Sequence, residues 1–105
     1  MNLDALWGGT ITGFVFDFDT GTARLRVSVL DDGRRTTSEL VVYEVTEIDF
    51  VSTIALPWNY AELTEVHVEP QDQGVSVQLV LWSEEATMRI RGVTVTVDVV
   101  SGVAG

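Results

Sequence analysis

The sequence contains no cysteine and no lysine, and its only histidine is His67. Without cysteine, the chain cannot form a disulfide, a thiolate zinc site or a cysteine nucleophile, which fits a reducing cytosol. Metal binding would depend on carboxylates and one imidazole. The first residues show no basic cluster followed by an apolar run, and no later stretch approaches the length of a membrane span. We therefore expect a soluble cytoplasmic protein.

The charge is strongly one-sided, with 16 acidic residues against 6 basic ones and a formal net charge of −10. Nucleic-acid backbones and anionic membranes would repel such a chain, so we expect neither as a partner. A cationic protein partner is compatible with this charge, although a high net charge also keeps a β-rich protein soluble. The 105 residues, 46% of them hydrophobic, indicate a single domain spanning residues 1–105.

Hydrophobic residues alternate with polar ones along most of the chain. Aromatic side chains take every second position in the segment 13–19, and aliphatic side chains do so in 23–29. This period of two predicts two strands joined as a hairpin. If residues 20–21 form a two-residue loop, Asp17 lies opposite Arg24 and the charges pair across the hairpin.

The same alternation, interrupted by turn residues, predicts further strands. Their approximate ranges are 37–43, 48–54, 62–69, 75–81, 88–91 and 93–99. The hydrophobic phase reverses at Gly92, where a bulge, a tight bend or a change of sheet is least costly. We expect an all-β fold, a two-sheet antiparallel β-sandwich of seven or eight strands. A small, partly open β-barrel is the alternative.

Acidic residues stand at alternate positions in the segment 17–21, just before a glycine, as at the start of a calcium-binding loop. No carboxylate follows in residues 22–29 to complete such a loop. Ion pairing of these acids with Arg24 and Arg26 across the hairpin explains them better.

A second candidate site is the outward face of the strand predicted at 62–69, where His67 stands between Glu65 and Glu69. Two flanking carboxylates could raise the pKa of the imidazole, and the three groups could act as acid, base or metal ligands. Side chains two positions apart on a strand also suit an ordinary solvated face.

A third candidate is an aromatic patch with an acidic rim. Trp82 has the parity of polar Gln78 and not that of the apolar stripe, so we expect its ring to face outward. An exposed tryptophan of this kind can anchor a protein interface, although these rings could instead cover the open ends of a sandwich. The proposed binding residues are Trp58, Tyr60, Trp82, Glu62, Glu84 and Glu85. No phosphate-binding loop is recognisable, and we expect no cofactor.

Three short segments carry a family resemblance: Leu6-Trp7-Gly8, Pro57-Trp58, and the run 81–85 before the last β segment. Together they resemble small bacterial all-β proteins of the immunity type, which neutralise the toxins of neighbouring cells. The resemblance covers most of the chain and implies a non-catalytic inhibitor of a cationic toxin or enzyme. It assigns no individual site residue.

Three functional hypotheses follow. The first is a non-catalytic, acidic protein-binding module that uses the aromatic patch. The second is an acid-base enzyme or metal protein centred on Glu65, His67 and Glu69. The third is a self-assembling subunit, a homodimer for example, in which the valine-rich C-terminal strand pairs with the edge of a neighbour.

Overall fold

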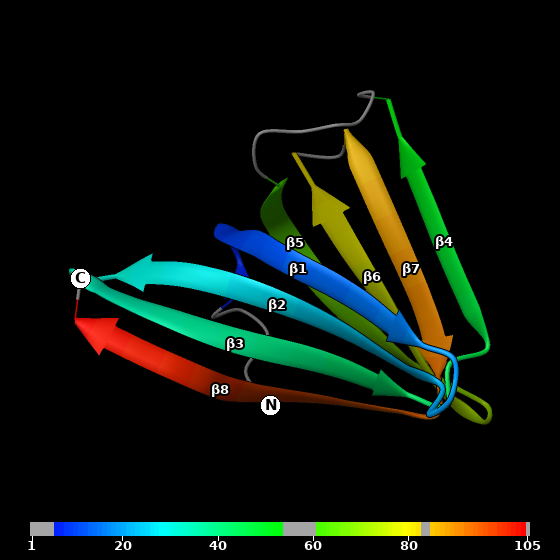
Figure 1. Ribbon diagram of the computed structural model, residues 1–105. Coiled ribbons are helices and arrows are strands. Elements are labelled where there is room, and N and C mark those ends of the chain that lie inside the picture. Colours follow the sequence, from blue (N-terminus) through cyan, green and yellow to red (C-terminus); the bar gives the residue numbers. More distant parts are fainter. Residues whose placement is uncertain (1–5, 54–60, 83–84, 105) are drawn as a thin grey trace.

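Antiparallel strands make up most of the computed structural model, which describes residues 6–53, 61–82 and 85–104. The eight strands are β1 (Gly9–Asp17), β2 (Thr22–Asp31), β3 (Arg34–Tyr43), β4 (Glu47–Ser52), β5 (Ala61–Gln71), β6 (Gly74–Leu81), β7 (Ala86–Gly92) and β8 (Thr94–Ala104). They form one sheet in the order β4-β7-β6-β5-β1-β2-β3-β8 (Figure 1). The all-β prediction is confirmed. The predicted two-sheet sandwich is not confirmed, because the strands form a single sheet, and this sheet is not closed into a barrel.

A short bridge between β1 and β5 joins the two halves of the sheet. Strands β1 and β5 pair through three residue pairs, which join Gly9–Ile11 to Ala61–Leu63. One half is β4-β7-β6-β5 and the other is β1-β2-β3-β8. The halves lie close together at the end where β3 leads to β4 and β7 to β8, and they spread apart toward the other end (Figure 1). Each half buries one face, as a sheet does in a sandwich.

The core lies between these halves and confirms the predicted alternation. In β2, β3 and β6, aliphatic residues that are 2% exposed or less occur at every second position, which is the expected pattern when one face of a sheet is covered. The fully buried members of the cluster include Leu25, Val27, Leu40 and Val42 from one half and Leu63, Val77, Leu79 and Ile90 from the other.

Two connections carry the chain between the halves at their close end. In the first, Glu44 follows β3 with a φ of 51°, a left-handed conformation that ends the strand. In the second, the Val93 N–H donates to the Tyr43 carbonyl at 2.8 Å. Gly92 is buried there, and a Cβ atom on it would lie 2.6 Å from the same Tyr43 oxygen. The phase reversal predicted at Gly92 is thus confirmed as a change from one half of the sheet to the other.

The register of the first hairpin differs from the prediction by two residues. Asp17 lies opposite Thr22, and Arg24 lies opposite Val15, so the pairing of Asp17 with Arg24 is wrong. The loop comprises residues 18–21 and is closed by the Gly21 N–H, which donates to the Asp17 carbonyl at 2.8 Å. A shift of two leaves every side chain on its predicted face, so the alternation could not detect it.

The arginines of β2 consequently bind a different acid. On the outer face of the sheet, Arg24 Nη1 lies 3.0 Å from Glu39 Oε1, and Arg26 Nη2 lies 3.2 Å from Glu39 Oε2. Glu39 belongs to β3, directly opposite Arg26. The ion pairs therefore join β2 to β3, and they do not involve the acids of the first hairpin.

Within the described segments, no helix has the length and apolar character needed to cross a bilayer.

Candidate protein-binding surface

The structure brings two members of the histidine group together. Glu65 and His67 lie on the outer face of β5, with Glu65 Oε1 2.8 Å from His67 Nε2. The Trp7 ring meets the imidazole edge-on, with ring centroids 5.9 Å apart. Glu69 is exposed further along the same strand. The outward orientation of all three is confirmed, while their catalytic or metal-binding role stays a prediction.

The chemistry available at this face is limited by its openness. The side chains of His67 and Glu65 are 47% and 36% exposed, so water competes for both. Among the described residues, no three His, Cys, Asp or Glu side chains lie close enough together to hold a metal ion. A hydrogen-bonded pair on an open strand face suits a structural contact better than a reaction centre, which needs a shielded position for substrate.

The aromatic patch predicted around Trp82 is only partly described. Trp58, Tyr60 and Glu84 lie outside the described residues. Trp82 is partly buried and packs against the core cluster, so its expected outward orientation is not observed. Its φ of 52° places it outside the extended geometry of β6. The parity rule holds only for extended backbone, which is why it does not apply here.

Of the acidic residues predicted for that patch, Glu62 and Glu85 are described, and the main-chain carbonyl of each accepts a hydrogen bond. Glu62 is partly buried, and its carbonyl accepts a hydrogen bond of 3.2 Å from the Trp82 N–H. Glu85 is exposed, and its carbonyl accepts a hydrogen bond from Thr53 Oγ1 at 3.0 Å.

A different aromatic residue, Phe18, is the most exposed large hydrophobic side chain of the described residues, at 87%. It stands in the β1–β2 loop with its ring edge-on to Phe16, at a centroid distance of 4.7 Å. These two rings, with Val45 and Ile48, line a cleft of about 330 Å³ beside the β3–β4 connection. We call this group of four apolar residues the Phe18 surface.

Acidic residues surround the Phe18 surface. Asp17 and Asp19 flank Phe18 in the chain, Glu44 precedes Val45, and Glu47 lines the cleft itself; all four are exposed. Glu47 Oε1 lies 3.3 Å from Arg91 Nε, so one of the four carboxylates is paired. The apolar centre is thus set in a predominantly negative rim.

Backbone hydrogen bonds hold the β1–β2 loop in place. The Asp17 carboxylate accepts a bond of 2.9 Å from the Asp19 N–H, an Asx turn. Gly21 adopts a φ of 68°, which glycine tolerates without strain. The Gly21 carbonyl then accepts a bond of 2.9 Å from the Val45 N–H, which fastens the loop to the β3–β4 connection. Phe18 is therefore presented by a braced turn.

Sequence reasoning missed this surface because Phe18 continues the alternation of Phe14 and Phe16. Those two residues are partly buried and pack against the core, whereas Phe18 lies beyond the end of β1. The signal that could have located the turn is Asp17 two residues before Asp19 and four before Gly21, a combination typical of Asx turns ending in a left-handed glycine.

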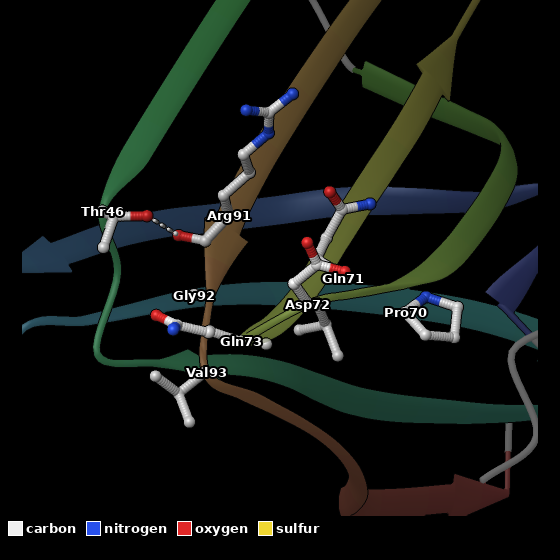
Figure 2. A pocket seen from close by; sticks show the side chains of 10 residues that line it. Thr46, Pro70, Gln71, Asp72, Gln73, Arg91, Gly92 and Val93 are labelled. Carbon is white, nitrogen blue, oxygen red and sulfur yellow. Dashed lines mark hydrogen bonds between the residues drawn. The ribbon is translucent and has the colours of Figure 1, made fainter.

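A larger but more polar cleft, of about 570 Å³, lies where the β5–β6 turn meets the two connections between the halves. Its lining includes Gln71, Asp72, Gln73 and Arg91 (Figure 2). The guanidinium of Arg91 points away from Gly92 along β7, and it is engaged by Glu47. Among the described residues that line this cleft there is no histidine.

No protein-family model matches the chain, and a search of curated proteins returns no significant match.

Proposed function

We propose that this protein is a non-catalytic binding module that recognises a cationic protein through the Phe18 surface. The observation that carries the proposal is the phenyl ring of Phe18, 87% exposed, beside an apolar cleft within an acidic rim. Covering a phenylalanine side chain stabilises a complex by about 1.5–3 kcal/mol. An aromatic anchor with a polar rim is the usual arrangement of an interface hot spot.

The charge of the rim selects the kind of partner. Asp17, Asp19 and Glu44 have no arginine within ion-pair distance among the described residues. A partner with lysine or arginine around an apolar side chain would complement both the rim and the cleft. The formal net charge of −10 would accelerate its approach at low salt. The braced loop lowers the entropy lost on binding, because Phe18 is already presented.

The partner class that fits this surface includes the cationic toxin or enzyme implied by the resemblance to immunity-type proteins. A neutral or acidic partner would leave the rim carboxylates desolvated without compensation, which disfavours binding.

The proposal can be tested by comparative capture from the lysate of the cells that make the protein. The wild-type chain, Phe18→Ser and the control Leu30→Ser would be immobilised in parallel. Leu30 is 61% exposed at the far end of β2, so the control removes an exposed apolar side chain elsewhere. We expect a basic protein that is retained by the wild type and by Leu30→Ser, and is lost with Phe18→Ser.

The decisive contrast is between the two variants. Retention of the same basic proteins by Phe18→Ser and Leu30→Ser, at equal amounts, would contradict the proposal. A partner that elutes only with detergent, and not with about 0.5 M salt, would contradict the role of the acidic rim.

A further inference from the structure

Strand β8 forms an open edge of the sheet. Among the strands that the structure describes, it is the last in the order and pairs only with β3, and it runs for 11 residues. The opposite edge, β4, has only 6 residues and carries Glu47 and Asp49. Short, charged edge strands resist pairing with other chains, whereas long edges of low charge invite it. Within Thr94–Ala104 the only charged residue is Asp98.

The regular part of this edge lies before a bulge. The β3–β8 register is continuous from Tyr43 opposite Thr94 to Ser38 opposite Val99, and it then shifts. Residues 94–99 therefore offer an undistorted edge of about the usual strand length. Val99 and Val100 are 69% and 51% exposed, so apolar surface accompanies the open backbone at the end of this stretch.

The charge of Asp98 is uncompensated on the outer face. It lies directly opposite Glu39, and like charges at opposing positions destabilise a sheet. Arg24 and Arg26 both bind Glu39, and among the described ion pairs neither reaches Asp98. A cation on the free side of β8 would give Asp98 an opposite charge, as Arg26 gives Glu39 one on the other side of the row.

We propose that β8 accepts an extended strand from a cationic protein, with a lysine or arginine opposite Asp98. The backbone of that strand would pair with the open edge, and its apolar residues at alternate positions would extend the inner face beside Val97 and Val99. The inference stands on β8 alone and does not depend on the Phe18 surface.

A second copy of the chain fits this edge less well. Each copy has a formal net charge of −10, and antiparallel pairing of two β8 strands brings the two Asp98 side chains toward the same region. Asp98 thus disfavours pairing between the β8 strands of two copies, and it favours pairing of β8 with a strand from a basic partner.

The test uses the full-length chain and a synthetic peptide of about nine residues that alternates valine and threonine around one central lysine. A matched peptide carries glutamate in place of the lysine. Calorimetry measures the affinities, and NMR maps the backbone amides that shift. We expect the lysine peptide to bind more tightly, with its shifts concentrated in β8. Asp98→Asn should weaken the binding of the lysine peptide by about two- to fivefold. It should also reduce the difference in affinity between the lysine and glutamate peptides.

The inference would be overturned by equal affinity for the two peptides, by shifts located away from β8, or by a wild-type chain that sediments as a dimer paired through β8. Phe18→Ser serves as the control variant and should bind the lysine peptide like the wild type. Loss of peptide binding in Phe18→Ser would show that the peptide uses the Phe18 surface, and this outcome too would overturn the inference.

Discussion

Gly92→Ala should destabilise the fold strongly, because Gly92 is packed against the other connection between the halves. A Cβ atom there would lie 2.6 Å from the Tyr43 carbonyl oxygen and 2.6 Å from Val42 Cγ1. The Tyr43 oxygen also accepts the 2.8 Å bond from Val93, so it cannot retreat without weakening that bond. Overpacking costs about 1–3 kcal/mol, and a lost backbone hydrogen bond costs about 1 kcal/mol more. We expect a loss of about 2–4 kcal/mol from the free energy of unfolding.

Urea denaturation followed by tryptophan fluorescence measures this change. With a slope of about 1–3 kcal/mol per molar urea, the midpoint should fall by about 0.7–4 M. Gly13→Ala is the matched control: Gly13 is exposed in β1, and a Cβ atom there has no neighbour within 4 Å. Its free energy of unfolding should change by less than about 0.5 kcal/mol. Equal midpoints for the two variants would refute the close packing assigned to Gly92.

Three further predictions concern the surface. Glu39→Gln removes both ion pairs to Arg24 and Arg26 and should lower the free energy of unfolding by about 0.5–1.5 kcal/mol in dilute buffer; a loss that persists in about 1 M salt would contradict an ionic origin. Phe18→Ser should lower the free energy of unfolding by less than about 1 kcal/mol, because the ring is 87% exposed and its edge-on contact with Phe16 is the main interaction lost. Phe16→Ser should cost more than about 1.5 kcal/mol, because Phe16 packs against the core; equal costs for the two variants would contradict this difference in burial. Millimolar Zn²⁺ or Ca²⁺ should shift the Tm by less than about 1 °C, since the described residues offer no three-ligand group; a rise of several degrees would reopen the metal hypothesis.

The local features of the fold were predictable from the sequence. In β6, Val77, Leu79 and Leu81 point into the core as their spacing indicates, and the arginines of β7 point outward. Such alternation depends only on the geometry of one strand. The phase change at Gly92 was also visible, because two strands on opposite sides of it must bury residues of opposite parity.

The pairing of strands was less accessible. A hairpin loop of four residues and one of two residues leave the same faces buried, so Asp17 was assigned the wrong partner. The junction of Gly9–Ile11 with Ala61–Leu63 joins segments far apart in the chain, and no local pattern encodes it. The alternation therefore predicted two sheets where a three-pair bridge makes one.

The candidate binding surface depended on where β1 ends. Phe18 has the same parity as Phe14 and Phe16, so the alternation predicts that it is buried. It is exposed because the turn between Asp17 and Gly21 ends the strand before it. Trp82 illustrates the opposite error: its parity indicates exposure, but a left-handed backbone places it against the core. Both errors occur at strand ends, where the period of two no longer applies.

Hydrogen exchange of the chain bound to its captured basic partner tests the central proposal most directly. Binding at the Phe18 surface predicts slower amide exchange in residues 17–21 and 44–48, and Phe18→Ser should abolish this protection. If these segments exchange at the same rate in the free and bound chain, while residues elsewhere become protected, the Phe18 surface is not the binding site.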